Sequence, residues 1–172
     1  MDATGLELVA QRVRDELSED AVAGTDFSHA QATLEVSPPA VLEVLTYLRD
    51  HDPEPWLFLS SVHGCDYLPQ EPRLGVHYQL LSMERCDRLG VKTRVGTDDP
   101  HLPSVSHLFP TANFHEREVY DMFGVEFDGH PDMRRILMPE DYEGHPQRRD
   151  FPVGGEPVFF THNEPHNPGY WQ

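Results

Sequence analysis

The chain has 172 residues and a formal net charge of −17, from 30 acidic and 13 basic side chains. This length suits one domain with its own hydrophobic core. The acidic excess argues against nucleic acid as a partner and against direct docking on an anionic lipid surface, because both need a cationic protein face. No apolar run is long enough to cross a bilayer, and the N-terminus lacks the basic and apolar regions of a signal peptide. We therefore expect a cytoplasmic protein.

The sequence contains no motif that predicts a bound cofactor or metal ion. Its two cysteines, Cys65 and Cys86, do not form the close pairs that zinc sites and iron–sulfur clusters use, and we predict two buried free thiols. His162 and His166 have the spacing of a zinc-binding helix, but Pro165 lies between them and prevents that helix. The sequence also contains no glycine-rich phosphate loop and no nucleophile elbow.

Apolar periodicity predicts two helices and four strands, the helices at 6–17 and 40–51 and the strands at 32–36, 56–62, 74–83 and 89–95. This order is typical of an α+β fold. We predict two layers, with the helices packed on one face of a mostly antiparallel or mixed sheet. The core domain is expected at residues 1–127. A Pro-rich extended C-terminal arm is expected at residues 128–172, lying on a surface because it has too little periodicity to build a core of its own.

A third helix is predicted from Asn113 to Phe123. Asn113 suits the N-cap position, and Gly124 suits a left-handed C-terminal cap. One face of this helix is apolar but includes the carboxylate of Glu116. The opposite face carries three charged residues: Arg117, Glu118 and Asp121.

A carboxylate within an apolar face needs a partner, because an unpaired buried charge is costly. Glu116 could complete a capping box by bonding back to the Asn113 backbone. It could instead form an ion pair with Arg134 or Arg135 of the C-terminal arm. A catalytic role for Glu116 is the third alternative.

Two similar units follow in the C-terminal arm. Gly129-His130-Pro131 precedes Arg134-Arg135, and Gly144-His145-Pro146 precedes Arg148-Arg149. Each unit combines a bend with an arginine pair. Since adjacent side chains of an extended chain point to opposite sides, one arginine of each pair can bond inward while the other faces outward. The alternative is that these arginines are solvent-facing charges on a loop.

The run from His115 to Val125 contains the pattern E-R-E-x-x-D-M-F-G, and the two G-H-P units with their double arginines continue it. This combination resembles the C subunit of NADH:quinone oxidoreductase, which forms the 30-kDa subunit family of respiratory complex I. The close similarity covers residues 102–152. Upstream of it, the chain agrees with the family in the order and length of its elements.

The resemblance implies a component of the hydrophilic arm of a proton-translocating complex, peripheral on the cytoplasmic side of the cell membrane. In that family electrons pass from NADH through FMN and iron–sulfur clusters, held by other subunits, to quinone. The resemblance implies no cofactor in this chain. It also implies that the C-terminal arm packs on the D subunit, which contributes to the quinone site, with the B subunit and further subunits as neighbours.

We therefore predict a structural and assembly subunit without catalytic, cofactor-binding or metal-binding residues of its own. The residues predicted to be structural or in contact with a partner all lie between 113 and 152: Glu116, Arg117, Glu118, Asp121, His130, Arg134, Arg135, His145, Arg148 and Arg149. One rival is the same subunit in a related membrane-bound hydrogenase or dehydrogenase. A rival of another class is a free-standing metal-dependent hydrolase built on the histidines.

Overall fold

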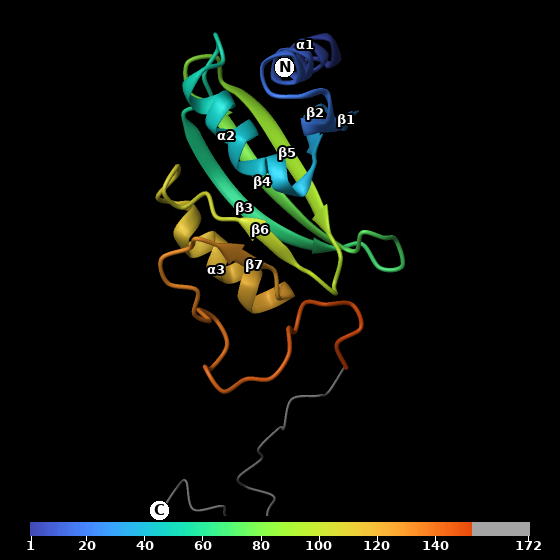
Figure 1. The fold of residues 1–172 in the computed structure, drawn as a ribbon, viewed down its shortest axis with the longest axis vertical. Coiled ribbons are helices and arrows are strands. Elements are labelled where there is room, and N and C mark those ends of the chain that lie inside the picture. Colours follow the sequence, from blue (N-terminus) through green and yellow to red (C-terminus); the bar gives the residue numbers. More distant parts are fainter. Residues whose placement is uncertain (153–172) are drawn as a thin grey trace, which may run out of the picture.

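The computed structural model describes residues 1–152, and the expectations for residues 153–172 lie outside this range. Figure 1 shows a sheet with helices packed against it and the C-terminal arm running below. The elements in chain order are α1 (Ala3–Glu16), the 3-10 turn η1 (Glu19–Ala21), β1 (Val22–Ser28), β2 (Gln31–Val36), the 3-10 turn η2 (Pro38–Ala40), α2 (Val41–Asp50), β3 (Phe58–Asp66), β4 (Leu74–Ser82), β5 (Asp87–Val95), β6 (His101–Pro103), α3 (Ala112–Phe123) and β7 (Glu126–Asp128).

The main sheet has five strands in the order β1-β2-β5-β4-β3. All neighbouring strands are antiparallel except β2 and β5, which pair in parallel because α2, β3 and β4 lie between them in the chain. A second, parallel pair joins β6 to β7. The predicted fold class, an α+β arrangement with a mixed and mostly antiparallel sheet, is confirmed.

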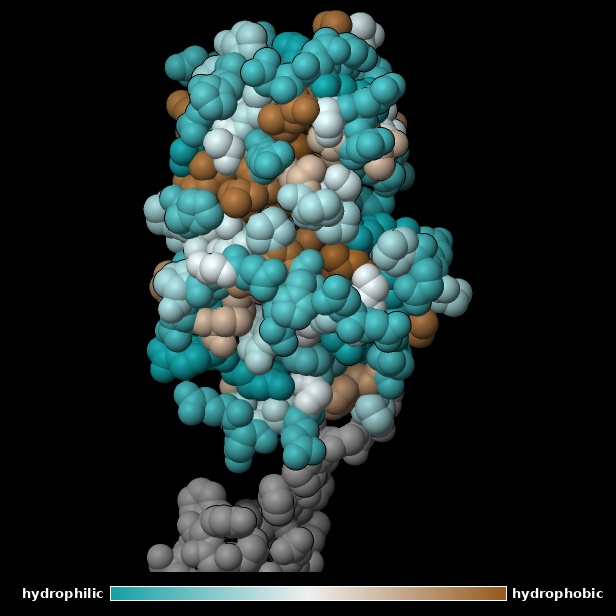
Figure 2. Space-filling view, in the orientation of Figure 1, coloured by the Kyte–Doolittle hydropathy of each residue, from teal (hydrophilic) through white to brown (hydrophobic). Residues whose placement is uncertain are grey.

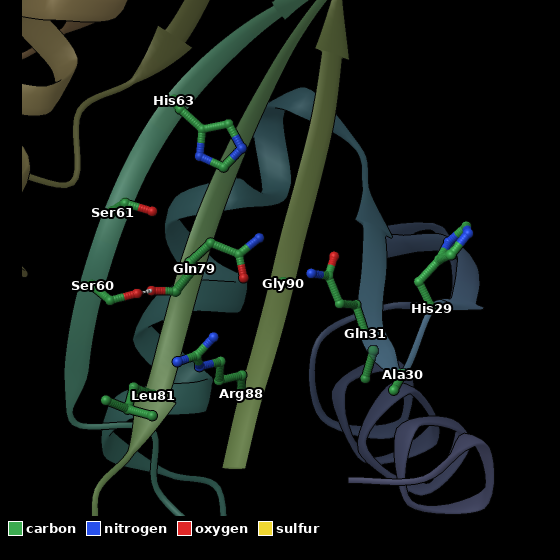
Figure 3. A pocket seen from close by; sticks show the side chains of 11 residues that line it. His29, Ala30, Gln31, Ser60, Ser61, His63, Gln79, Leu81, Arg88 and Gly90 are labelled. Atoms are coloured by element: carbon green, nitrogen blue, oxygen red, sulfur yellow. Dashed lines mark hydrogen bonds between the residues drawn. The ribbon is translucent and has the colours of Figure 1, made fainter. Parts of the chain in front are cut away.

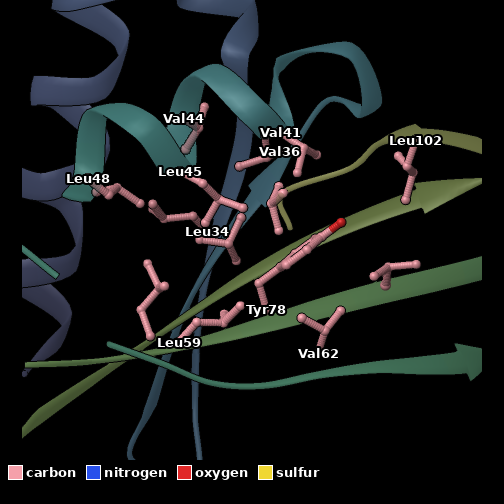
Figure 4. Packing of buried hydrophobic residues seen from close by; sticks show 14 of the residues in the cluster. Leu34, Val36, Val41, Val44, Leu45, Leu48, Leu59, Val62, Tyr78 and Leu102 are labelled. Carbon is pink, nitrogen blue, oxygen red and sulfur yellow. The ribbon is translucent and has the colours of Figure 1, made fainter. Parts of the chain in front are cut away.

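The core lies between the helices and one face of the sheet. Val44, Leu45 and Leu48 on one side of α2 pack over Leu34 and Tyr78 of the sheet, and all five side chains are buried (Figure 4). Burial of apolar area of this kind supplies the main stabilising free energy. The alternation in β4 and β5 puts every second residue into this core and the others on the opposite side, as the sequence pattern indicates.

No helix of the described chain covers that opposite side, which we call the open face. Strand residues paired in register share a face, so Ser61 of β3, Gln79 of β4 and Gly90 of β5 lie side by side on it. In the view from the helix side, small apolar patches show among hydrophilic residues, and hydrophilic residues predominate around the C-terminal arm (Figure 2).

Helix α3 packs on the core side of β3 and also covers that strand's free edge. A Cβ atom on Gly64 of β3 would lie 2.3 Å from the Phe123 ring, so only glycine allows this approach. Along the edge, the Val62 N–H donates to Nδ1 of His115 at 3.2 Å, and the Thr111 hydroxyl donates to the Leu59 carbonyl at 3.4 Å. This packing places α3 against the sheet and turns its other side toward the C-terminal arm.

Some local expectations were wrong. Strand β1 was not predicted, because Val22 is its only buried residue and its apolar alternation is correspondingly weak. Trp56 is buried but precedes β3, since its N–H donates to the Leu48 carbonyl at the end of α2. Both cysteines are free, but Cys86 is exposed in the turn before β5 and Cys65 is only half-buried on the open face. Within residues 1–152 no helix is long and apolar enough to cross a membrane.

Candidate functional site: helix α3 and the C-terminal arm

The boundaries of α3 follow from its two ends. The helix begins at Ala112, one residue before the expected N-cap Asn113, because the chain already turns at Phe109, whose carbonyl accepts the Ala112 N–H at 2.9 Å. The Asn113 cap was therefore wrong. At the other end Gly124 adopts φ 74° and donates its N–H to the Tyr120 carbonyl at 2.8 Å, as a left-handed cap should.

Gly124 is also the place where the C-terminal arm comes closest to α3. A Cβ atom there would lie 2.4 Å from Nε2 of His145 and 2.6 Å from a guanidinium nitrogen of Arg148. Both the backbone conformation and the approach of these two side chains therefore require glycine.

Glu116 is fully buried, and it holds the loop before α3 instead of capping its own helix. Its carboxylate accepts the Val105 N–H at 2.8 Å and the Ser104 hydroxyl at 2.7 Å. The capping box with Asn113 and the ion pair with Arg134 or Arg135 were both wrong, because the side chain faces this loop and not the arm. Burial raises the Glu116 pKa to about 7, against the opposing effect of its two hydrogen bonds.

His130 fastens the start of the C-terminal arm to the first turn of α3. Its Nδ1 accepts the Asp132 N–H at 3.0 Å, so the hydrogen lies on Nε2, which donates to the Asn113 carbonyl at 3.1 Å. The same Nε2 is 3.9 Å from the Glu116 carboxylate. We interpret this distance as a close contact and not as an ion pair, because the hydrogen on Nε2 already points at the Asn113 carbonyl.

Asp121 is the main anchor of the C-terminal arm. Although it was placed on the exposed side of the helix, it is fully buried, because the arm folds over it. One carboxylate oxygen accepts three consecutive backbone N–H groups, from Ile136 at 3.0 Å, Leu137 at 2.7 Å and Met138 at 2.8 Å. The other accepts the Arg135 guanidinium at 2.6 Å.

The ionisation of Asp121 reflects these contacts. Burial is the largest single influence and opposes ionisation, but the bonds from Met138, Arg135, Leu137 and Ile136 together outweigh it. The pKa of Asp121 therefore lies below its ordinary value. A buried carboxylate that stays charged in this way needs every one of its donors.

The first arginine pair alternates as expected. The Arg135 side chain is 12% exposed and bonds inward to Asp121 and to the Gly144 carbonyl, whereas the Arg134 side chain is 65% exposed and pairs with Asp132. Arg117 of α3 donates to the backbone carbonyls of both arginines, at 3.0 and 3.2 Å.

Glu118, the remaining charged residue of the motif, is exposed, and no hydrogen bond or ion pair holds it within residues 1–152. It therefore differs from Glu116, Arg117 and Asp121, each of which makes side-chain hydrogen bonds inside the chain. Glu118 is free to meet another molecule.

The second unit lies at the other end of α3, and its arginines do not alternate as expected, because both bond to carbonyls of the core domain. Nδ1 of His145 lies 3.1 Å from the Asp121 carbonyl, and Arg148 donates to the Phe123 carbonyl at 2.6 Å. Arg149 reaches across to the β3–β4 connection, where it donates to the Leu68 carbonyl at 2.6 Å.

A cluster that the sequence did not reveal fixes the last described residues. Arg73 donates to both carboxylate oxygens of Asp66 and to both of Asp150, at 2.6 to 2.8 Å. The backbone N–H of Arg149 donates to Asp66 as well, at 2.7 Å. The bond from Arg73 is the leading reason that the pKa of Asp66 lies far below its ordinary value. Asp66 and Arg73 belong to no sequence motif, so only the fold brings them to Asp150.

The site thus consists of the hydrogen bonds and ion pairs that attach the extended C-terminal arm to α3. In residues 1–152 no three His, Cys, Asp or Glu side chains converge so that they could hold a metal ion. All charged groups of the motif except Glu118 are directed at backbone or side-chain partners within residues 1–152.

Comparison with known proteins identifies the family of this chain. The profile described as "Respiratory-chain NADH dehydrogenase, 30 Kd subunit" matches residues 34–157. The chain belongs to this family. It is 47% identical over 146 residues to the C subunit of NADH-quinone oxidoreductase in Roseiflexus castenholzii, covering 84% of this chain and 83% of that protein. It is 50% identical over 129 residues to the protein of the same name in Salinispora arenicola, covering 74% of this chain and 53% of the longer relative.

Solved structures agree with the fold. A trypsin-resistant fragment (1-134) of Nqo5 superposes with a TM-score of 0.58 at 30% identity, over 74% of this chain and 98% of the fragment. A chain of an archaeal respiratory membrane complex, the membrane-bound sulfane sulfur reductase, gives a TM-score of 0.66 at 24% identity, over 87% of this chain and 86% of its own length. This second likeness concerns the fold alone.

Proposed function

We propose that this member of the family is a non-catalytic structural and assembly component of a proton-translocating NADH:quinone oxidoreductase. It belongs to the hydrophilic arm of that complex, on the cytoplasmic side of the membrane. There it supports the D subunit, which contributes to the quinone site, with the B subunit and others nearby. NADH, FMN, the iron–sulfur clusters and the quinone are bound by other subunits, and this chain holds no cofactor.

The main support for this proposal is that charged residues of the family motif bond to the C-terminal arm of the same chain. Asp121 and Arg135 bind the C-terminal arm to α3, and both carboxylate oxygens of the buried Asp121 accept hydrogen bonds from that arm. A catalytic acid or base must be able to reach a reacting group. These residues instead shape a surface, which is the work of an assembly subunit.

The outward side of the C-terminal arm is the proposed contact with the neighbouring subunit. Leu137 is 59% exposed and Arg134 points away from the domain. Exposed aliphatic and arginine side chains side by side are typical of protein interfaces. Because Asp121 fixes the backbone of the arm, this contact surface exists before the partner arrives, which lowers the entropic cost of association.

The test is to replace the native chain in the cell by Asp121→Asn. An Asn amide presents two hydrogens toward groups that are themselves donors, so the arm should come loose and at least tenfold less complete complex should assemble. NADH oxidation by ferricyanide, which needs no quinone, should persist in the remaining material while NADH:quinone turnover falls in proportion to the complex. Asp141→Asn, at an exposed carboxylate in the same arm, is the matched control.

Two outcomes would overturn the proposal. One is a normal amount of Asp121→Asn complex that has lost quinone reduction, because the chain would then take part in the chemistry. The other is oxidation of NADH, or binding of flavin or iron, by the purified chain alone. The proteins that co-purify with the chain separate this complex from a related membrane-bound hydrogenase.

Substitutions at Arg134 and Arg135 test the proposed contact between the C-terminal arm and the neighbouring subunit. Arg134→Ala should reduce assembly without lowering the stability of the free chain, because within residues 1–152 the Arg134 side chain bonds only to the partly exposed Asp132. Arg135→Ala should lower both, since it leaves Asp121 without its cation. If neither substitution changed the amount of complex, the double arginine would not be part of the interface.

A further inference from the structure

The open face of the sheet carries a hollow with a volume of about 680 Å³. Its floor is built from the outward residues of three strands, among them Ser61, His63, Gln79 and Arg88 (Figure 3). The helices lie behind the strands in this view, so the hollow opens away from the core and away from the C-terminal arm. The motif residues of the candidate site do not line it.

On the part of this face formed by β3, β4 and β5 the charge is opposite to that of the molecule, whereas the acidic outward positions Glu35 and Asp26 lie on β2 and β1. Along β5 the outward positions are Arg88, Gly90, Lys92 and Arg94, and none of the outward positions that β3 and β4 pair with them is acidic. The chain as a whole has a net charge of −17. A cationic strip on a strongly acidic protein attracts acidic partners to that place and repels them elsewhere.

Two of these side chains, Arg88 and Arg94, make no hydrogen bond or ion pair with the described residues. Within the described residues Lys92 bonds to Glu35 of β2 at 2.8 Å, but no hydrogen bond or ion pair engages Arg88. The Arg94 guanidinium stacks on the Tyr67 ring at 4.5 Å, and its buried Nε and one Nη have no hydrogen-bond acceptor. Arg88 lines the hollow with a free guanidinium, and a carboxylate is the group that fits a guanidinium best.

One end of the open face is apolar. Phe58 and Leu81 are paired in register at that end, and the Phe58 residue is 46% exposed. Around the edge of β3 lies a second hollow of about 420 Å³, which Phe58 and Ser60 share with Phe114 of α3. Phe114 is 62% exposed. Since Ser60 also lines the larger hollow, the apolar and cationic areas form one continuous surface.

We propose that this surface docks an acidic segment of another protein subunit, which places a carboxylate at Arg88 and covers Phe58 and Phe114 with apolar side chains. The inference rests on the proposed function in that the chain works inside a multi-subunit complex. It adds a second contact on the side of the sheet opposite the C-terminal arm. The chain would then be held between two neighbours, and not attached at one side only.

The occupant can be identified by photocrosslinking in the intact complex. Gln79→benzoylphenylalanine puts the reactive group in the middle of the hollow. The expected product joins position 79 to an Asp- or Glu-rich peptide of a different protein subunit, identified by mass. A product with residues 153–172 of the same chain, a product with lipid, or no product in the assembled complex would each overturn the proposal.

Charge reversal measures the contribution of the surface. Arg88→Glu places a carboxylate opposite the acidic segment, so the retention of the chain in the complex should fall at least tenfold, and more at low ionic strength. Arg14→Glu, on α1 behind the sheet, is the matched control and should not change retention. Equal retention of Arg88→Glu and native chain would refute the role of this strip.

The two proposals can fail separately. The open face is unoccupied if Arg88→Glu assembles normally and the crosslinker at position 79 forms no product with another subunit. The proposed function still stands in that case, provided that Asp121→Asn prevents assembly. If the chain is absent from the purified complex, both fail. Circular dichroism of the free variants shows whether Arg88→Glu and Arg14→Glu fold alike.

Discussion

At the scale of single residues, the two acidic groups of α3 behave in opposite ways. Glu116 is buried with two neutral donors, and its pKa is raised to about 7. Asp121 is buried with four donors, one of them a guanidinium, and its pKa is lowered. The number and charge of the donors decide whether a buried carboxyl is held neutral or ionised. Glu116 should therefore make folding depend on pH, in the direction opposite to an ordinary acidic residue.

This gives a prediction for Glu116→Gln. Between pH 4.5 and about 7 the unfolded chain has released the Glu116 proton while the folded chain keeps it, so native stability falls as the pH rises through this window. The shift corresponds to roughly 3 kcal/mol. Gln can accept from Val105 and donate to Ser104 without titrating. Urea unfolding at pH 5 and pH 8 should show a loss of stability in the native chain that is mostly absent from the variant.

Glu118→Gln is the control for this measurement, because Glu118 is exposed on the same helix. Comparing each variant with the native chain at both pH values cancels the contributions of other titrating groups. If Glu116→Gln and the native chain lost the same stability between pH 5 and 8, the raised pKa would be wrong.

At the scale of elements, the C-terminal arm is held at four places along its described length. His130 binds its start, Asp121 holds its middle, the carbonyls at the end of α3 hold His145 and Arg148, and the Asp66–Arg73 pair holds its end. The arm thus consists of short extended segments between bonded points. Each point uses a carboxylate, a carbonyl or a cation from the core domain, so the arm needs no core of its own.

The last of these points can be weakened selectively by Arg73→Lys. A lysine keeps the charge but cannot bond both oxygens of Asp66 and of Asp150 at once. We expect trypsin to cleave after Arg148 and Arg149 several-fold faster in the free variant, read by mass at those bonds. Arg12→Lys, at a guanidinium that bonds Asp52 far from the arm, should leave these rates unchanged. Equal rates in both variants would show that Arg73 does not hold the arm.

The sequence predicted these elements unevenly, for physical reasons. Helices α1 and α2 and strands β4 and β5 bury a regular apolar pattern, which can be read locally. The Gly124 cap is also local, since a left-handed residue at a helix end favours glycine. The partners of Glu116 and Asp121 are mostly backbone N–H groups of loops. Nearly every residue offers the same backbone N–H donor, so the side-chain pattern of the sequence does not predict which of these donors will bond to a carboxylate. Asp66 and Arg73 meet Asp150 only through the fold.

At the scale of the whole molecule, the core and the C-terminal arm contribute differently to stability. The buried apolar residues of the described chain end at Phe127, and beyond it only Met133 and Met138 pack partly against the core. The domain division at residue 127 is still a prediction. It implies that a chain ending at Asp128 keeps its fold.

Truncation after Asp128 tests that division. The shortened chain should retain the far-UV circular dichroism of the native sheet and helices and unfold cooperatively. Its melting temperature should fall by several degrees, because Asp121 and Arg117 lose their partners and Glu116 loses the cover of His130. A molten or unfolded product would mean that the arm is part of the folding unit and that the boundary is misplaced.

The side-chain bonds along the edge of β3 have a consequence for the chain's life before assembly. A bare sheet edge is a template on which a second copy can add its own strand. His115 occupies the Val62 amide and Thr111 the Leu59 carbonyl, so two of the backbone groups that a foreign strand would need along this edge are already bonded. The side chains at the start of α3 therefore disfavour strand addition at the β3 edge of the sheet.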